Sequence, residues 1–177
     1  MGIRFIKPAT GDNNKMKIGI IADTHDNLPQ IRKAVEIFNR EKVELVLHAG
    51  DFVSPFTCLE FKNLNCPLKG VFGNNDGDKI YLQEKFKGIG ELFPEPYKTN
   101  INHKNIIMLH LEKLIDALAE SQKYEVIIYG HTHQTDLHKI GKTIIINPGE
   151  CGGWLTGKST IALLDLINLE AKIINLA

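Results

Sequence analysis

Acids, amides and histidines recur in this sequence of 177 residues directly after apolar segments. They are Asp23, His25, Asp51, Asn74, Asn75, His110, His131 and His133. Carboxylates, amide oxygens and imidazoles, in the absence of thiolates, suit ions such as manganese, iron, nickel, cobalt or zinc. These side chains therefore predict a site for divalent metal ions, and not a structural zinc site rich in cysteine.

The number of candidate ligands indicates two ions. Two acids, one amide and four imidazoles are more ligands than one tetrahedral ion needs. In a two-metal site, one carboxylate bridges ions about 3.5–4 Å apart. His131 and His133 flank one residue, so in an extended segment both imidazoles project to the same side of the chain. We expect both to reach one metal cluster.

Each fragment taken alone has a simpler explanation. Asp23 with His25 is compatible with a helix cap and a surface histidine, and Gly-Asp or Gly-Asn usually forms a turn. Turns and caps do not explain why such residues follow five successive apolar runs.

Other polar residues and one cysteine lie outside the predicted ligand set, because simpler structural roles explain them. We expect His48 in a core or behind the ligands, His103 in a turn, His138 on a strand surface, Asp76 orienting neighbours or closing a turn, and Cys151 near the cleft without a catalytic role.

The elements that must position the ligands follow an α/β pattern. Short apolar runs span 17–22, 43–48, 68–72, 105–109 and 125–129, and amphipathic segments separate them. In open α/β sheets, sites form beyond the carboxyl ends of the strands. We therefore expect the five ends to converge on one crevice.

Helix and hairpin signals complete the pattern. The sequence predicts a helix from Leu28 to Phe38 capped by Asn27, a second after Ser54-Pro55, and a third over 111–118. Hairpins are predicted over 96–109, 134–147 and 158–176, with turns near 102–105, 141–142 and 168–169. These hairpins indicate a second, mixed sheet.

Composition limits the class of protein. Lys and Arg number 21, as do Asp and Glu, so no net charge attracts a polyanion, which argues against non-specific nucleic-acid binding. The three cysteines form no framework of pairs, and no apolar run is long enough to cross a bilayer. We expect a cytoplasmic protein with one domain over 16–177, preceded by a flexible extension over 1–15.

The ordered motifs resemble the calcineurin-like metallophosphoesterase family, in particular its small single-domain bacterial and archaeal phosphodiesterases. The motifs are Asp23-x-His25, Gly50-Asp51, Gly73-Asn74-Asn75-Asp76, His110 and Gly130-His131-x-His133, together with the turn Asn147-Pro148-Gly149. The resemblance implies an α/β fold: a four-layer α/β/β/α sandwich with two mixed sheets. It also implies hydrolysis of small phosphate esters, phosphodiesters first, by a hydroxide that bridges two ions.

The same resemblance implies roles for individual residues. One ion would be held by Asp23, His25, Asp51 and His133, and the other by Asp51, Asn74, His110 and His131. Asp51, Asn74 and Asn75 would be the catalytic residues. The implied cofactors are two divalent ions per chain, with manganese expected first and nickel, iron, cobalt or zinc as alternatives. The expected partner is a small phosphodiester or phosphomonoester, and a homo-oligomer stays open.

Two positions depart from the family pattern. Asn75 stands where many members carry a histidine that assists the leaving group, and an amide cannot deliver a proton at neutral pH. Leu111 follows His110 where the branch usually has glycine, which puts the backbone approach of His110 to the metal in question. Two alternatives to a phosphodiesterase are a non-catalytic scaffold on the same fold, like the retromer subunit, and a nuclease.

Overall fold

The computed structural model describes residues 16–176, and its strands form two sheets. The first sheet has the order β11-β10-β1-β2-β3-β4 and the second the order β5-β6-β7-β9-β8. The first contains β1 (Lys17–Ile21), β2 (Leu45–His48), β3 (Leu68–Val71), β4 (Gly90–Phe93), β10 (Thr160–Asp165) and β11 (Glu170–Asn175). The second contains β5 (Tyr97–Ile101), β6 (Lys104–Met108), β7 (Val126–Ile128), β8 (Thr135–Ile140) and β9 (Thr143–Pro148).

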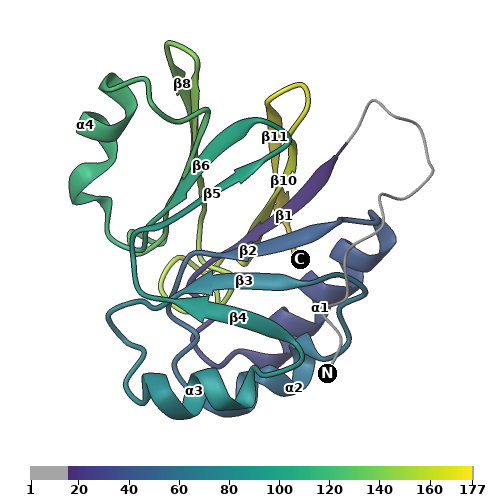
Figure 1. Cartoon of the computed structure of the whole chain (residues 1–177). Coiled ribbons are helices and arrows are strands. Elements are labelled where there is room, and N and C mark those ends of the chain that lie inside the picture. Colours follow the sequence, from purple (N-terminus) through teal and green to yellow (C-terminus); the bar gives the residue numbers. More distant parts are fainter. Residues whose placement is uncertain (1–15, 177) are drawn as a thin grey trace.

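Helices cover the outer faces of both sheets. On the first sheet lie α1 (Leu28–Arg40), α2 (Cys58–Phe61) and α3 (Lys79–Lys85), and on the second lies α4 (Ile115–Glu120) (Figure 1). Short 3₁₀ turns, η1 (Pro55–Thr57) and η2 (Glu112–Leu114), precede α2 and α4. Within residues 16–176, no helix combines the length and the apolar character that crossing a bilayer requires.

Three apolar clusters hold the layers together. Ile18 and Ile20 of β1 point between the two sheets, whereas Ile21 points toward α1, because successive side chains of a strand alternate between its faces. A third cluster joins Ile127 of β7 to Ile115 of α4. Three interfaces require four layers, which confirms the expected α/β/β/α sandwich with two mixed sheets.

The three predicted hairpins are present, but they do not all build the second sheet. β5 pairs with β6 and β8 with β9 in the second sheet, whereas β10 and β11 extend the first. β10 pairs antiparallel with β1 along the edge that β2 leaves open, with Ile18 opposite Leu164. The predicted second, mixed sheet is therefore present, but the third hairpin belongs to the first sheet, because turn chemistry does not determine which edge a hairpin joins.

One helix and one strand carry too little periodic signal to be predicted from the sequence. The seven residues of α3 bury only Leu82, and the four residues of β4 bury only Leu92. In the chain, both lie between β3 and β5, so this segment leads from the first sheet to the second. The loop after β4 also supplies Glu95, which contacts the site described below.

The helix that follows the first ligand segment starts as predicted. The Asn27 side chain accepts a hydrogen bond from Gln30 N, and Pro29 lies in the first turn of α1. Ser54, by contrast, makes no side-chain cap, and the helix predicted after Ser54-Pro55 is a 3₁₀ turn followed by a single α-helical turn. Its hydroxyl donates instead to the Asp26 carboxylate (2.6 Å). Ser54 therefore ties two loops together.

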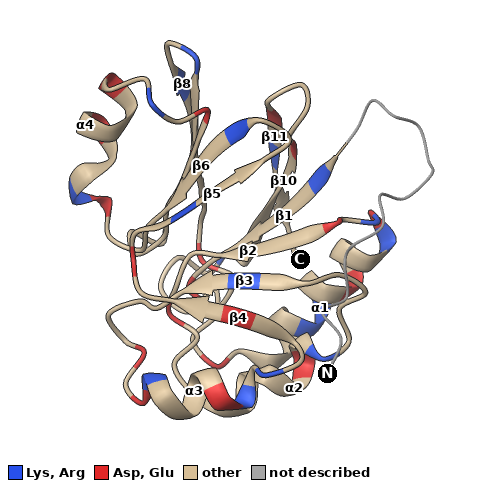
Figure 2. Ribbon diagram, in the orientation of Figure 1, with Lys and Arg blue, Asp and Glu red and all other residues tan. Residues whose placement is uncertain are grey.

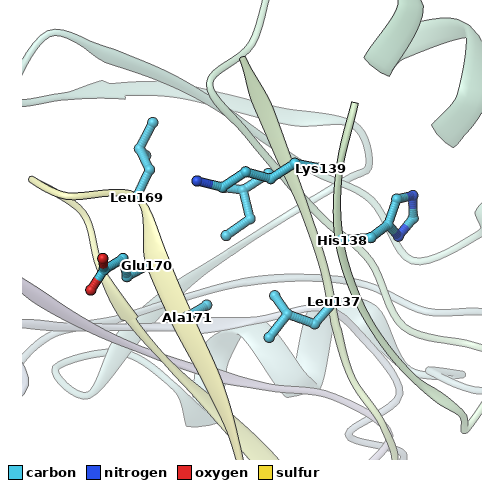
Figure 3. A pocket seen from close by; sticks show the side chains of 7 residues that line it. Leu137, His138, Lys139, Leu169, Glu170 and Ala171 are labelled. Carbon is cyan, nitrogen blue, oxygen red and sulfur yellow. The ribbon is translucent and has the colours of Figure 1, made fainter. Parts of the chain in front are cut away.

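Other surface features lie away from the ligand segments. Lys and Arg are interspersed with Asp and Glu over the helices and strands (Figure 2). A cavity of about 410 Å³ lies between the β8–β9 and β10–β11 hairpins, where Leu137 and Lys139 point toward the β11 side and His138 points away (Figure 3). The residues that line this cavity include none of the predicted metal ligands.

Candidate metal centre

The predicted ligands lie where strands of both sheets end. Five of these seven residues have a left-handed backbone, with φ of 49° at Asp23, 39° at His25, 61° at Asp51, 68° at His131 and 60° at His133. Such conformations are uncommon outside glycine and cluster at functional sites. Because His131 and His133 are both left-handed, the prediction that they lie in an extended segment was wrong.

The glycines before the ligands leave space for ligands from other strands. A β carbon on Gly50 would lie 2.6 Å from His110 Nδ1, and one on Gly130 would lie 2.9 Å from Asp23 Oδ2. Any larger residue would occupy the position of a predicted ligand. The Gly-Asp and Gly-His dipeptides are therefore required by packing between strands as well as by turn geometry.

One group of ligands surrounds Asp23. His25 Nε2 lies 3.9 Å and His133 Nε2 lies 3.8 Å from Asp23 Oδ1, and His25 Nε2 lies 3.6 Å from Asp51 Oδ2. These separations are too long for hydrogen bonds. They are close to the distance of about 3.4 Å between two ligands held about 2.1 Å from one tetrahedral ion. His25 Nε2 is also buried without a hydrogen-bond partner. The donor set therefore fits a metal ion.

A second group surrounds His110, which is fully buried. Its Nε2 lies 2.7 Å from Asn74 Oδ1 and 3.4 Å from Asp51 Oδ2, and its Nδ1 lies 2.9 Å from the Ala49 carbonyl. A proton on Nδ1 donated to that carbonyl leaves the Nε2 lone pair directed at the site. Leu111 has φ −81° and ψ 142°, so this position does not need the glycine of the family pattern.

His131 is the most open of the four predicted histidine ligands. Its backbone N–H donates to Asp23 Oδ2 (3.0 Å), and its ring packs edge-on against that of His110 with centroids 5.1 Å apart. Its Nε2 points toward Glu112, 3.9 Å from Oε2, and 37% of the side chain is exposed. The structure thus brings the His131 ring beside the second group, with Nε2 near Glu112.

Asn75 contacts the shared carboxylate directly. Its backbone N–H donates to Asp51 Oδ1 (2.8 Å), and its amide Nδ2 donates to Asp51 Oδ2 (2.7 Å). The residue is otherwise exposed. Asn75 therefore holds Asp51 in position and has one face open to a ligand.

Burial and opposite charge set the protonation of the acids and imidazoles. Burial raises the pKa of Asp23 to about 7. Burial alone would lower the pKa of His110, but hydrogen bonding and attraction to Asp51 raise it to about 9. Burial would raise the pKa of Asp51, yet His110 and Asn75 hold it well below its usual range. Burial lowers the pKa of His25. Protons and cations therefore compete for this cluster.

Glu150 supports His133 and was not predicted as a site residue. It is fully buried, and its Oε2 lies 2.9 Å from His133 Nδ1. It also accepts hydrogen bonds from the backbone N–H groups of Trp154, Leu155 and Thr156. A carboxylate on the far nitrogen of an imidazole fixes the tautomer and orientation of a metal ligand. Its place directly after the Asn147-Pro148-Gly149 turn was the only available sequence signal.

Two further acids fix the backbone around the site. Asp76 accepts hydrogen bonds from the backbone N–H groups of Gly73 (2.7 Å), Val53 (2.7 Å) and Asp51 (3.2 Å), which confirms that it orients its neighbours. Glu95 accepts hydrogen bonds from the backbone N–H groups of His110 and Leu111. No local pattern indicated Glu95, because it approaches from the loop between β4 and β5.

The remaining histidines lie where the sequence predicted. His48 is buried, accepts from Gly50 N through Nδ1 and contacts Thr24 Oγ1 through Nε2. Burial holds the pKa of His48 well below its usual value, so Nε2 carries its proton and donates to Thr24. His103 and His138 are exposed in a turn and on a strand. The Cys151 thiol is buried in the cluster beneath α1, and burial raises its pKa.

Comparison with sequences of known proteins places this arrangement in a family. Residues 16–168 match the model of the calcineurin-like phosphoesterase superfamily domain. A phosphodiesterase of Methanocaldococcus jannaschii is 44% identical over 161 residues, which cover 89% of this chain and 97% of the relative. A probable metallophosphoesterase of Methanothermobacter thermautotrophicus is 34% identical over 164 residues, covering 90% and 92%.

Solved structures agree with this assignment. A structure described as a novel archaeal phosphodiesterase has a TM-score of 0.86 at 43% identity, covering 90% of this chain and 99% of the other. Vacuolar protein sorting 29 of Cryptosporidium parvum has a TM-score of 0.64 at 16% identity, covering 92% and 97%. The second likeness shows the fold alone.

Proposed function

The chain belongs to the calcineurin-like phosphoesterase superfamily, and we propose that it is a dinuclear metal-dependent phosphodiesterase that hydrolyses small phosphate esters. The position of Asp51 carries this proposal. One oxygen, Oδ2, faces His25 Nε2 at 3.6 Å and His110 Nε2 at 3.4 Å. A carboxylate oxygen between two imidazoles from different loops suits a ligand shared by two ions.

The two groups around Asp51 support the ligand sets that the family resemblance implies. Asp23, His25, Asp51 and His133 would hold one ion, and Asp51, Asn74, His110 and His131 would hold the other. The buried, unpartnered Nε2 of His25 supports the first set. The contact between His110 and Asn74 supports the second. The ring contact between His131 and His110 supports the place of His131 in that set.

The reaction divides between the ions and the chain. Two divalent ions supply an activated water at neutral pH and neutralise charge on the phosphoryl oxygens. The chain holds Asp51 through Asn75 and His133 through Glu150. The side-chain amide of Asn75 can donate a hydrogen bond to a phosphoryl oxygen but cannot protonate a leaving group. We therefore expect good leaving groups, or protonation from solvent, to be favoured.

The proposal extends to the metal and to the class of ester. Oxygen and imidazole ligands without thiolate favour manganese, with nickel, iron, cobalt or zinc as alternatives. We propose diesters as the substrates before monoesters, because the 44% identical relative is named a phosphodiesterase. The interspersed charges of Figure 2 argue against a long polyanion as substrate.

Hydrolysis assays test the proposal. A nitrophenyl diester and the matching monoester are incubated with the protein and each of manganese, nickel, cobalt, zinc and magnesium. We expect metal-dependent turnover that Asp51→Asn reduces by at least about a hundredfold, because the shared ligand is lost. Asp116→Asn, an exposed acid on α4, is the matched control and should retain wild-type activity.

Metal analysis separates the two ligand sets. Protein purified without chelators should carry about two ions per chain. His110→Ala should retain one, because only the second set loses a ligand. Full activity in Asp51→Asn would contradict the mechanism. Metal-free wild-type protein without turnover under any of these ions would instead favour the scaffold alternative.

A further inference from the structure

The loop over 151–156 lies directly against the segment that carries two of the proposed ligands. Gly152 N–H donates to the Asp23 carbonyl (2.9 Å), and Asn27 Nδ2 donates to the Gly152 carbonyl (2.7 Å). A β carbon on Gly152 would lie 3.1 Å from the Asp23 carbonyl oxygen. The loop and the ligand segment are therefore in tight contact, and the loop forms one rim of the site.

Trp154 is fixed on this rim and yet largely open to solvent. Its indole Nε1–H donates to the carbonyl of His25 (2.9 Å), and its backbone N–H donates to Glu150 Oε2 (3.0 Å). Glu150 Oε2 also lies 2.9 Å from His133 Nδ1. The indole is thus bonded to the backbone of His25, and the Trp154 backbone shares Glu150 with His133, while 64% of the residue is exposed.

We propose that Trp154 stacks on an aromatic ring or nucleobase of the substrate, which makes aryl or nucleoside phosphodiesters the preferred class. This inference rests on the proposed function. The indole hydrogen bond to His25 already restricts the rotation of this large apolar ring. Stacking on it therefore costs little further entropy. Every nucleobase presents a π face, so this contact selects for the presence of a ring and not for its identity.

The expected strength of the contact makes the proposal measurable. Stacking of one base on an aromatic side chain contributes about 5- to 150-fold in affinity. Two probes separate this contribution from phosphate binding. Adenosine 5′-monophosphate carries phosphate, ribose and base, whereas ribose 5-phosphate lacks the base. Both should bind the metal centre through phosphate, and only the first should contact Trp154.

Calorimetry on manganese-loaded protein compares the two probes. Wild-type protein should bind the nucleotide about tenfold tighter than ribose 5-phosphate. Trp154→Ala should bind both equally, with its affinity for ribose 5-phosphate unchanged, and Trp154→Phe should retain most of the preference. Ile167→Ala, an exposed apolar side chain in the β10–β11 turn, is the control and should behave as wild type.

Fluorescence supplies a readout independent of turnover, because Trp154 is the single tryptophan of the sequence. The nucleotide should quench its emission in a saturable manner, and ribose 5-phosphate should not. Equal affinity of wild type and Trp154→Ala for the nucleotide would overturn stacking. If Trp154 emission changes with protein concentration and not with nucleotide, stacking is also overturned. Trp154 would then contact a second copy of the chain. The same preparations are also assayed for hydrolysis of the nitrophenyl diester, which Asp51→Asn should lose. This assay reports on the proposed function separately from stacking.

Discussion

Gly73 approaches Asp51 so closely that a β carbon on Gly73 would lie 2.1 Å from Asp51 Oδ1. The backbone N–H of Gly73 is held in the same place by Asp76 Oδ2 (2.7 Å). No side chain fits between β3 and the carboxylate that follows β2. The glycine is therefore a condition for the position of the shared ligand.

Gly73→Ala should displace Asp51 and lower phosphodiesterase activity. A shift of about 1 Å at a catalytic group can reduce the rate about a hundredfold, and we expect a loss of that size. Gly77→Ala is the matched control, because nothing lies within 4 Å of a β carbon there and its backbone needs no positive φ. Activities are compared at saturating metal, with thermal melts to confirm folding. Similar activity in both variants would refute the steric argument.

Glu150→Gln should weaken metal binding at the first ligand set. Loss of the negative charge behind His133 leaves its Nδ1 less firmly oriented, and such changes reduce metal affinity about 10- to 100-fold. Titration with manganese measures the effect, with Glu120→Gln on the exposed face of α4 as control. An unchanged affinity in Glu150→Gln would show that the carboxylate serves the loop over 151–156 alone.

Metal affinity should rise with pH. In the metal-free protein the pKa of Asp23 is raised to about 7 and that of His110 to about 9, so both groups carry protons below these values. A protonated ligand cannot coordinate, and binding must release protons. The apparent dissociation constant should therefore fall between pH 6 and pH 8, by about tenfold per unit for each proton displaced. Calorimetry in buffers of different ionisation enthalpy counts these protons, and a constant affinity without proton release would contradict the expectation.

Asn75→His should improve the hydrolysis of esters with poor leaving groups. A histidine can deliver a proton that the amide cannot, and such general acids contribute about 10²- to 10⁴-fold. The rate for an alkyl diester should rise relative to the nitrophenyl diester, whose leaving group needs no proton. Asn75→Gln controls for the lost contact with Asp51. An equal change for both substrates would argue against a missing proton donor.

Local sequence patterns were sufficient to propose the ligands and to locate most elements. Apolar runs located the strands that precede Asp23, Asp51 and Asn74, and turn residues located all three hairpins. The cap at Asn27 also follows from local chemistry, because the side chain bonds a backbone group three residues away. Such features depend on neighbours in the chain, so they can be read from the sequence.

Local sequence was a poor guide to the setting of three predicted ligands, for one physical reason. His110 looked doubtful because a glycine was missing after it, yet contacts with Ala49 and Asn74, 61 and 36 residues away, position its ring. His131 and His133 were expected in an extended segment, whereas the hydrogen bond from His131 N to Asp23, 108 residues away, accompanies a left-handed turn. Long-range contacts outweigh local preference at these positions.

The sequence by itself determined which donor atoms are present, their order along the chain and the α/β layout that brings strand ends together. Only the tertiary structure decided that β10 and β11 extend the first sheet, that Glu150 supports His133 and that Trp154 lies on the rim beside His25. Periodicity reports which face of an element is buried. It carries no information about which distant element covers that face, because that choice depends on packing among all the layers at once.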